Sequence, residues 1–357
     1  MERWSPHRQG DFNGFFADRR DFARESMTRG GIWARQRQVE AVQRGICGGR
    51  LSYFDGSNIR FAPYLSPFIE IDGDLVDIGP EHDTHINGIW CHINDKLIDS
   101  QGHETASAPS ASTTYYAYVC SPRAGFGESG LSYAAVTTGQ MRPQGPRLRL
   151  SATAPVSLPK WVNGKTNTYL PGSPPLIGLK YLGMTDRARC WRYVGLVRTS
   201  ATPTFEDSVT QRFVANFHNR VRKSMVATDG TNSWTYTTAT WRQANANTAN
   251  KVEFVCHDDV VEFMVMCPVQ NSGGATAASV GIGIDSTSAD SSQLRSAYPS
   301  QAGVWIPSQA VYKGNLSDGY HYAAWLEYSV ASGTTTWYGD NGNPTVTQSG
   351  IIGSVMV

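Results

Sequence analysis

The sequence is poor in charge and contains no long apolar run. Charged residues make up 17% of the 357 residues, against an average of about 25%. The formal net charge is only +1, which excludes a globally basic nucleic-acid-binding protein. No apolar run approaches the roughly 18 residues of a transmembrane helix. Residues 1–8 lack the apolar segment of a secretory signal, so we expect neither membrane insertion nor secretion.

The usual signatures of enzymes, cofactor sites and metal sites are missing as well. The six cysteines never form a C-x-x-C pair and fit no zinc ribbon. We therefore expect buried free thiols in a protein made in a reducing cytoplasm. The chain has no G-x-S-x-G motif, no P-loop and no H-E-x-x-H motif. These absences predict a protein without enzyme activity and without a cofactor.

The first distinctive feature along the chain is an arginine-rich N-terminal segment, which we call the head. The first 50 residues carry ten Arg and no Lys, against six acidic residues. Aromatic residues at three- and four-residue steps predict a helix that Asp11 caps and Gly30-Gly31 ends. A second segment has apolar residues at seven-residue steps, which pack either against partner chains or against their own domain. We predict a helical anchor over residues 1–47 whose assembly residues are Phe12, Phe15, Phe16, Phe22, Ile32, Val39 and Ile46.

Beyond the head the sequence pattern changes to that of β-strands. Asp-Gly turns at residues 55–56 and 72–73 separate alternating segments and predict two hairpins. We expect a hairpin-rich β-module over residues 48–223. It is interrupted by a proline-rich inserted arm at about residues 121–175, because loops of that length are unusual in a compact core.

The last third of the chain predicts a β-sandwich or jelly roll over residues 224–357. Short strands are expected at 277–285, 303–312, 320–330, 334–339 and 350–357, with turn signals between them. Another two predicted strands flank His257, Asp258 and Asp259, a polar sequence that is typical of a hairpin turn. The fold class is therefore mainly β, with a short helical anchor at the N-terminus.

One segment resembles a known family. Residues 194–199, 205–208 and 211–220 are similar to a segment that recurs in tail and fibre proteins of tailed bacteriophages. The aromatic strand at residues 114–118 precedes it in the same order, and residues 11–16 resemble the anchor helix of phage tail appendage proteins. The positions that carry the central motif are Gly195, Arg198, Phe205, Asp207, Gln211, Arg212, Phe213, Asn216, Asn219 and Arg220.

The resemblance implies a non-enzymatic structural protein of a virion, made in the host cytoplasm. It implies a tail-attached fibre, spike or adaptor that forms homotrimers and docks onto other virion proteins through its head. A capsid head fibre or decoration protein would have the same architecture and is the first alternative. A glycan-degrading tailspike enzyme is the alternative from another functional class. Within the motif, Arg198 and Arg212 flank Glu206 and Asp207, and this spacing independently predicts a partly buried arginine–carboxylate pair with a structural role.

Candidates for metal binding and catalysis are weak. Residues 81–85, Glu-His-Asp-Thr-His, with His92 beyond them, are the best metal candidate, but no helix is predicted to align the imidazoles. We interpret the segment as a polar turn and expect no metal site. The carboxylates of the last third, among them Asp285, Asp290 and Glu327, show no arrangement typical of a glycosidase.

Aromatic residues crowd the predicted sandwich near Asn, Asp and Gly. Aromatic rings that combine apolar area with polar edges suit sugar binding. We predict a glycan- or receptor-binding surface formed by Trp305, Tyr320, Tyr322, Trp337 and Tyr338. Packing within the core or between subunits is the alternative use of the same rings.

Overall fold

The structure is a computed structural model that describes residues 47–71, 74–79, 88–100, 102, 104–120, 146–157, 168–169, 191–274, 276–296 and 298–357. The predicted anchor residues lie outside this part of the chain, and so does the candidate metal segment at residues 81–85. The anchor residues concerned are Phe12, Phe15, Phe16, Phe22, Ile32, Val39 and Ile46.

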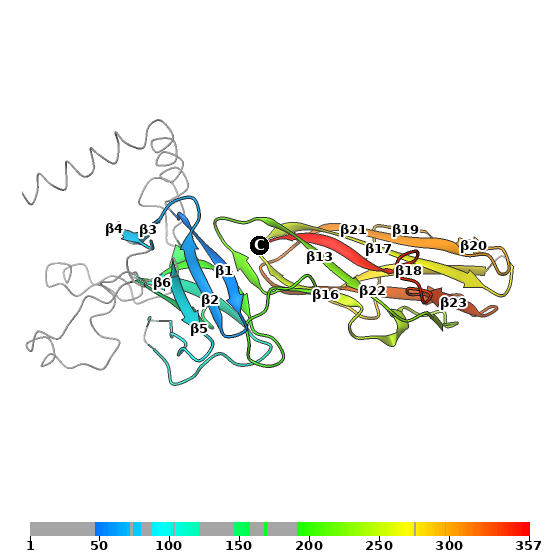
Figure 1. Cartoon of the computed structure of the whole chain (residues 1–357), viewed down its shortest axis with the longest axis horizontal. Helices are drawn as coiled ribbons and strands as arrows, with labels where there is room; N and C mark the ends of the chain where they lie inside the picture. The colour runs from blue at the N-terminus through cyan, green and yellow to red at the C-terminus, as the bar shows by residue number, and fades with distance from the viewer. Residues whose placement is uncertain are drawn as a thin grey trace, which may run out of the picture.

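The described chain is mainly β, as the sequence predicts, and it forms an N-terminal module followed by an elongated sandwich (Figure 1). The module holds three sheets. The first comprises β1 (Gly49–Asp55), β2 (Asn58–Pro63) and β5 (Ile89–His92); the second comprises β3 (Phe68–Ile71) and β4 (Asp74–Asp77). The third has the order β7 (Arg147–Ser151), β6 (Thr114–Cys120), β10 (Trp191–Arg198), β9 (Thr168–Tyr169) and β8 (Val156–Ser157), with β12 (Val214–Asn216) paired to β10.

Both hairpins predicted from the Asp-Gly turns are present, as β1–β2 and β3–β4. Period-two alternation explains their burial, since Leu51, Ile59 and Phe61 on one face are at most 1% exposed. Burial of each such side chain contributes roughly 1.5–3 kcal/mol to folding.

The inserted arm predicted at residues 121–175 needs a correction. Its residues 147–151 form β7, which pairs with β6 along five residues. Leu148 and Leu150 alternate inward and are at most 1% exposed. The many prolines around this strand hid a short apolar alternation that the core needs. The strands β8 and β9 also fall within the predicted arm.

The sandwich consists of two sheets packed face to face (Figure 1). The six-stranded sheet has the order β11 (Gln211–Arg212), β16 (Lys251–Cys256), β22 (Gly319–Ser329), β18 (Thr276–Ile284) and β20 (Tyr298–Ser300), with β15 (Arg242–Gln243) paired to β22. The seven-stranded sheet has the order β13 (Arg222–Thr228), β24 (Gly350–Met356), β17 (Asp259–Asn271), β21 (Ile306–Leu316) and β19 (Leu294–Arg295), with β23 (Thr335–Tyr338) and β14 (Ser233–Thr235) attached beyond β17. A 3₁₀ turn, η6 (Ala244–Ala246), precedes β16.

The sandwich core lies between the two sheets and is built by inward-facing residues of both. Phe254 and Phe263 approach one another across the core with ring centroids 5.5 Å apart. Trp325 on β22 and Trp337 on β23 belong to the same hydrophobic cluster, and both are fully buried. This aromatic content gives the elongated domain a continuous core.

The predicted hairpin at residues 257–259 is wrong, although the turn itself exists. It joins β16 to β17, and these strands belong to different sheets rather than pairing with each other. Alternation along the sequence shows where a strand faces inward, but both sheets of a sandwich give the same pattern.

The described residues also bear on the cysteine thiols and on membrane-spanning helices. Four cysteines, at positions 47, 91, 256 and 267, are buried free thiols, and Cys120 is buried as well. Burial raises the pKa of the Cys47 thiol to about 11 and that of Cys256 to about 12, so both stay protonated. No helix in the described ranges is long and apolar enough to cross a membrane.

Candidate binding tip and the junction that supports it

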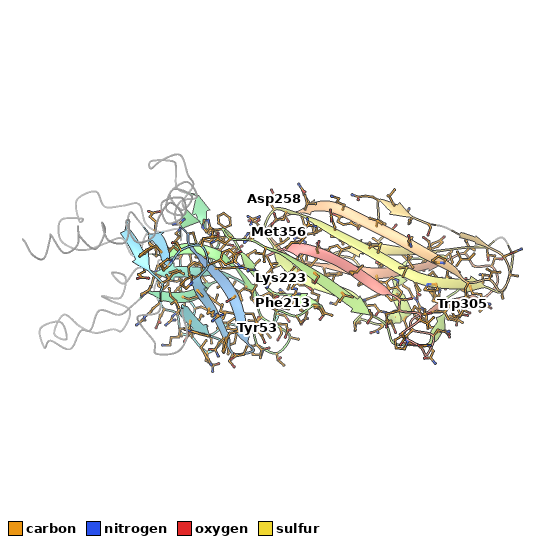
Figure 2. All side chains as sticks on the ribbon, turned by 45° about the horizontal axis from the view of Figure 1, so that its top comes forward. Tyr53, Phe213, Lys223, Asp258, Trp305 and Met356 are labelled. Atoms are coloured by element: carbon orange, nitrogen blue, oxygen red, sulfur yellow. The ribbon has the colours of Figure 1, made fainter. Side chains whose placement is uncertain are left out.

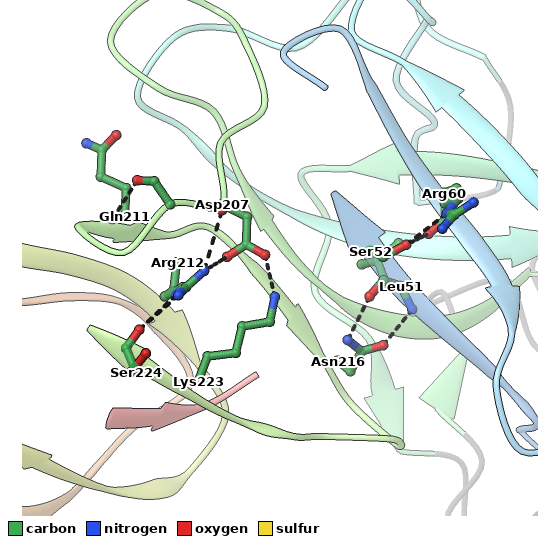
Figure 3. A network of polar contacts seen from close by, with 10 residues as sticks. Leu51, Ser52, Arg60, Asp207, Gln211, Arg212, Asn216, Lys223 and Ser224 are labelled. Carbon is green, nitrogen blue, oxygen red and sulfur yellow. Dashed lines mark hydrogen bonds and ion pairs between the residues drawn. The ribbon is translucent and has the colours of Figure 1, made fainter. Parts of the chain in front are cut away.

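The motif segment forms the junction between the N-terminal module and the sandwich. The chain leaves the module along β10, pairs briefly with the sandwich sheet as β11, and returns to β10 as β12 before entering β13. Its polar contacts reach both bodies, as Figure 3 shows. The motif residues therefore meet where the two parts of the chain are joined.

Two asparagines of the motif hold the first strand of the module. Asn216 accepts a hydrogen bond from the amide of Leu51 at 2.6 Å and donates one to the carbonyl of Leu51 at 2.8 Å (Figure 3). Asn219 donates to the carbonyls of Cys47 and Gly49 at 2.8 and 2.7 Å. Both side chains are buried, so these bonds satisfy polar groups that water does not reach.

Gly195 is required by a close approach of two strands. A Cβ atom at this position would lie 2.1 Å from the carbonyl oxygen of Ala215 on β12. The register of β10 against β6 also shifts between Tyr193 and Gly195, which marks a bulge. A residue without a side chain lets β12 approach the bulged strand.

The predicted arginine–carboxylate pair exists between Arg212 and Asp207. Their Nη1 and Oδ1 atoms lie 3.2 Å apart, and Lys223 also contacts Asp207 (Figure 3). Arg212 further donates to the carbonyl of Ser224 at 2.9 Å from Nη2. The Asp207 carboxylate thus ties the loop before β11 to β13, the strand that carries Lys223 and Ser224.

Arg198, the other arginine considered for the predicted pair, makes a different contact. Its guanidinium carbon lies 3.7 Å from the ring centroid of Tyr320 in the sandwich. Tyr320 donates to Glu253, which also accepts a bond from Gln211 at 3.0 Å. Burial alone would raise the pKa of Glu253, but these bonds and Lys251 hold it below its ordinary value. The contact is therefore a cation–π bridge backed by a carboxylate.

The other motif residues complete the junction. Phe205 is 1% exposed, and its amide donates to the carbonyl of Gly56 at 2.8 Å. The ring of Phe213 meets Tyr320 edge-on at 6.2 Å. Arg220 donates to Asp259, at the start of β17, at 2.7 Å. Every residue of the motif thus contributes packing or hydrogen bonds at or beside the junction.

A buried aromatic and histidine cluster, which sequence reasoning missed, lies in the same junction. The ring of Phe217 lies 5.2 Å from both Tyr193 and His257, and His218 lies 4.9 Å from Phe217. Neither ring nitrogen of His257 has a hydrogen-bond partner among the described residues. Burial, together with the positive charge of Arg220, lowers the pKa of His257 to about 4, although Asp318 at 3.7 Å acts in the opposite direction. Burial, together with Arg192 and Arg220, lowers the pKa of His218 to about 3. Both imidazoles are therefore neutral near pH 7.

The candidate binding site lies at the far end of the sandwich. Figure 2 shows Trp305 at the end away from Tyr53 and Phe213. The Trp305 and Tyr338 rings stack with centroids 4.0 Å apart and planes tilted by 35°. Both donate to the same oxygen of Gln270, from Trp305 Nε1 at 3.0 Å and from the Tyr338 hydroxyl at 2.6 Å. We call Trp305, Tyr338 and Gln270 the tip triad.

Asn271 holds the loops around the tip triad in place. It is 1% exposed, and its amide nitrogen donates to Ser332 and Thr335 at 3.1 and 2.7 Å. Its side-chain oxygen accepts from Gly273 at 2.7 Å, while its carbonyl accepts from Gly303, which has φ of +74°. One buried asparagine thus organises three loops. The polar end of β17 was the only signal for Gln270 and Asn271 in the sequence.

The five aromatic residues that the sequence predicts for one binding surface lie in three different places. Trp305 is 42% exposed and Tyr338 is half-buried, but Trp337 is fully buried in the core. The assignment of Trp337 to a binding surface is therefore wrong, because alternation along β23 turns it inward. Tyr320 and Tyr322 do share a face, with centroids 6.4 Å apart. They lie at the junction rather than at the tip.

The metal-ligand side chains and the buried carboxylate Glu327 can be examined in the described residues. No group of three or more His, Cys, Asp or Glu residues in the described ranges could hold a metal ion. Glu327 is buried, but Trp234, Arg242 and the amide of Asn245 all bond to it. Its carboxylate oxygens accept hydrogen bonds from three groups of the domain, so Glu327 has a structural role.

Comparison with known proteins assigns no family. No family model matches the chain, and no curated protein matches it. Among solved structures, infectious bursal disease virus of the Gt strain aligns with a TM-score of 0.26 and 10% identity over 86% of this chain and 66% of that one. The Gx strain aligns with a TM-score of 0.22 and 10% identity, over 87% of this chain and 66% of that one.

A further alignment is to the Cry4Aa toxin of Bacillus thuringiensis, with a TM-score of 0.20 and 9% identity, over 87% of this chain and 51% of that one. The chain spans just under two thirds of the length of the virus chains and about half of the toxin. At these TM-scores the likeness assigns neither a fold family nor a function.

Proposed function

We propose that this chain is a non-enzymatic structural protein of a tailed-phage virion. It attaches to the tail as a fibre, spike or adaptor through its N-terminal head, and its sandwich points outward. The observation that carries the proposal is the tip triad, which presents a stacked aromatic pair at the end of the sandwich farthest from the N-terminal module. The resemblance of the motif residues to phage tail proteins supports the same role.

The chemistry of the tip triad fits a sugar ring. An exposed indole offers a flat apolar surface to the C–H face of a sugar, and polar groups at its edge select hydroxyl positions. The carboxamide oxygen of Gln270 already accepts two bonds, which fix the rings before a ligand arrives. Its amide nitrogen has no partner among the described residues and supplies donors for a hydroxyl. The ligand class is therefore a host-surface glycan.

The junction suits an outward position of the tip. Fibre and spike domains have to hold their tips at a distance from the particle, and a loose linker would not do so. Here Arg198 of the module contacts Tyr320 of the sandwich, Asn216 fixes β12 to β1 on the module side, and Arg212 ties the connecting loop to β13 on the sandwich side. The interlocked path of β11 and β12 adds backbone pairing on both sides. The sandwich is thus supported as a rigid extension of the module.

The test is binding of purified full-length protein to polysaccharide extracted from the surface of susceptible host cells. Trp305→Ala should weaken binding by at least tenfold, because it removes the exposed stacking surface. Gln270→Ala should weaken it as well, by freeing both rings. The matched control is Trp90→Ala, since Trp90 is a half-buried tryptophan of the N-terminal module. Equal binding by wild type and Trp305→Ala would contradict the tip assignment.

The same preparation distinguishes a binding protein from a depolymerase. Incubated with the polysaccharide, the wild type should release no new reducing ends over hours. Sustained release of oligosaccharides would overturn the non-enzymatic role and favour the tailspike alternative. Antibody labelling of intact virions separates a tail position from the capsid alternative.

A further inference from the structure

The outer face of the seven-stranded sheet carries a continuous row of apolar side chains. Directly opposed residues of neighbouring antiparallel strands share a face. The register places Val226 opposite Ile352, Ile352 opposite Met264, Met264 opposite Val311, and Val311 opposite Leu294. We call these five residues, on β13, β24, β17, β21 and β19, the apolar row.

The apolar row is open to solvent in the single chain. Leu294 is 69% exposed, Ile352 50%, Met264 41% and Val311 36%. Met266 and Val260, which face the same way along β17, are 40% and 41% exposed. Single exposed apolar residues are common on protein surfaces, but a contiguous patch across several strands marks an interaction site.

The other sheet of the sandwich shows that this exposure is not a general property of the domain. On its outer face Ala324 and Leu326 of β22 are fully buried. Gly281 and Gly283 lack side chains there, and a Cβ on either would lie within 3 Å of the chain's own loop at residues 286–290. Among the described residues, loops thus cover one outer face of the sandwich, and no described segment covers the apolar row on the other.

Charge on the uncovered face is sparse and already paired. Beside the apolar row, Glu262 contacts Arg222 at 3.2 Å and also contacts Lys313. The remaining outward residues of β17 between Met264 and Gln270 are uncharged. A strongly charged partner would find no complementary field here, whereas a second face of the same composition fits without leaving a charge unpaired.

The size of the face also fits a subunit interface. Strands lie about 4.8 Å apart and rise about 3.3 Å per residue. β17 and β21 run along the whole of this face, whereas β24 pairs with β17 only from Glu262 to Met266 and β19 has two residues, so the five strands together cover roughly 500 Å². A specific interface buries at least about 500 Å² on each partner. The face reaches that size, and it ends at Pro268, one outward position before Gln270 of the tip triad.

We propose that this face binds the same face of another copy of the chain, so that the sandwiches associate through the apolar row. Sheets packed face to face lie about 10 Å apart with interdigitated side chains, which the mixed Met, Val, Ile and Leu surface allows. Gln270 is the next outward position of β17 after Pro268, so the tip triad borders this face at its outer end. This surface deepens the proposed virion role, on which its biological meaning rests, and its test is separate from glycan binding.

The experiment is the molar mass of the full-length protein by light scattering over a range of concentrations. Wild type should show twice 39.1 kDa, because a face that packs against the same face of another copy closes a dimer, and three times that mass would contradict face-to-face packing. Met264→Lys and Ile352→Lys each place a charge in the apolar row and should weaken association more than tenfold, giving the monomer mass at micromolar concentration. Both positions are exposed, so the melting temperature of the monomer should confirm that the variants fold.

Two control variants make the result specific. Val346→Lys changes the most exposed large apolar residue of the described chain, at 77%, in the loop between β23 and β24; it should keep the wild-type mass. Trp305→Ala should also keep that mass while losing glycan binding. A monomeric wild type at every concentration would overturn the proposal, and so would Met264→Lys and Ile352→Lys variants that remain oligomeric.

Discussion

The side chain of Asn216 pairs with the backbone of Leu51 as another strand would. Its amide oxygen and nitrogen bond to the amide and carbonyl of the same residue, 165 positions away in the sequence. The two-way contact links the last strand of the third module sheet to the first strand of the first. It also fixes the point from which the chain enters the sandwich. The geometry of the junction therefore depends on one buried carboxamide.

Replacing Asn216 by Ala should destabilise the protein. The substitution leaves the buried amide and carbonyl of Leu51 without partners, and each such group costs about 1–3 kcal/mol. We expect a loss of about 2–4 kcal/mol in the free energy of unfolding, measured by urea denaturation. Asn343→Ala, at an exposed loop position, should change stability by less than about 0.5 kcal/mol. Equal effects of the two would contradict the role given to Asn216.

A second prediction concerns the approach of β12 to β10. Gly195→Ala would place a methyl group 2.1 Å from the carbonyl oxygen of Ala215, so the strands would have to separate. Overpacking of this kind costs about 1–3 kcal/mol or more. Gly274→Ala is the matched control, because nothing lies within 4 Å of the added atom. A Gly195→Ala variant as stable as Gly274→Ala would mean that the strands adjust freely.

Much of this fold is predictable from the sequence because its signals are local. Asp-Gly turns and strict alternation identify β1–β2, β3–β4 and the long strands of the sandwich. Pairing between distant strands is not local: nothing near residues 257–259 says that β16 and β17 belong to different sheets. β7 was missed for a similar reason, since its five residues stand among prolines and gain their burial only from β6.

The Arg198–Tyr320 contact should couple the two bodies measurably. Stacking at 3.7 Å in a partly buried place predicts a coupling energy of about 1–2 kcal/mol in a double-mutant cycle of Arg198→Ala and Tyr320→Leu. The cycle is measured by chemical unfolding. Arg60 and Trp90 form a looser pair at 5.9 Å within the module, and the same cycle there should give a smaller value. A coupling energy no larger than that of Arg60 and Trp90 would contradict the role of the Arg198–Tyr320 contact in joining the two bodies.

The buried histidines predict a loss of stability in mild acid. An unfolded histidine takes up a proton near pH 6.5, whereas folding holds the pKa of His257 at about 4 and that of His218 at about 3. The unfolded state therefore binds more protons as the pH falls from 6.5 toward 4, so the folded state loses stability across that window. Between pH 7 and pH 5 each histidine should cost about 2 kcal/mol.

The measurement is the free energy of unfolding against pH for wild type and for the His218→Gln/His257→Gln variant. The variant should be less sensitive to pH between 7 and 5, whatever its absolute stability. Glu253 and Asp229 have lowered pKa values and lose their contribution only as the pH falls through those folded values, below this range. Identical pH dependence in both proteins would show that the histidines are not the cause.

The site was only partly predictable from sequence, for reasons visible in single residues. Composition identified the aromatic richness of the last third, and Trp305 and Tyr338 do meet at the tip. It did not separate them from Trp337, because neighbouring residues of one strand face opposite sides and only the second sheet decides which side is the core. Gln270 and Asn271 carry no chemical signature, and their roles follow from three loops that converge in space.

The central claim is that this chain is an assembled part of a virion that carries its tip outward. The most direct measurement is electron microscopy of virions, produced from the genome that encodes the chain, labelled with gold-bound antibodies raised against the purified protein. The account predicts label on appendages of the tail. Label on the capsid would contradict the tail position, and unlabelled particles that also lack the protein by mass spectrometry would contradict the virion role itself.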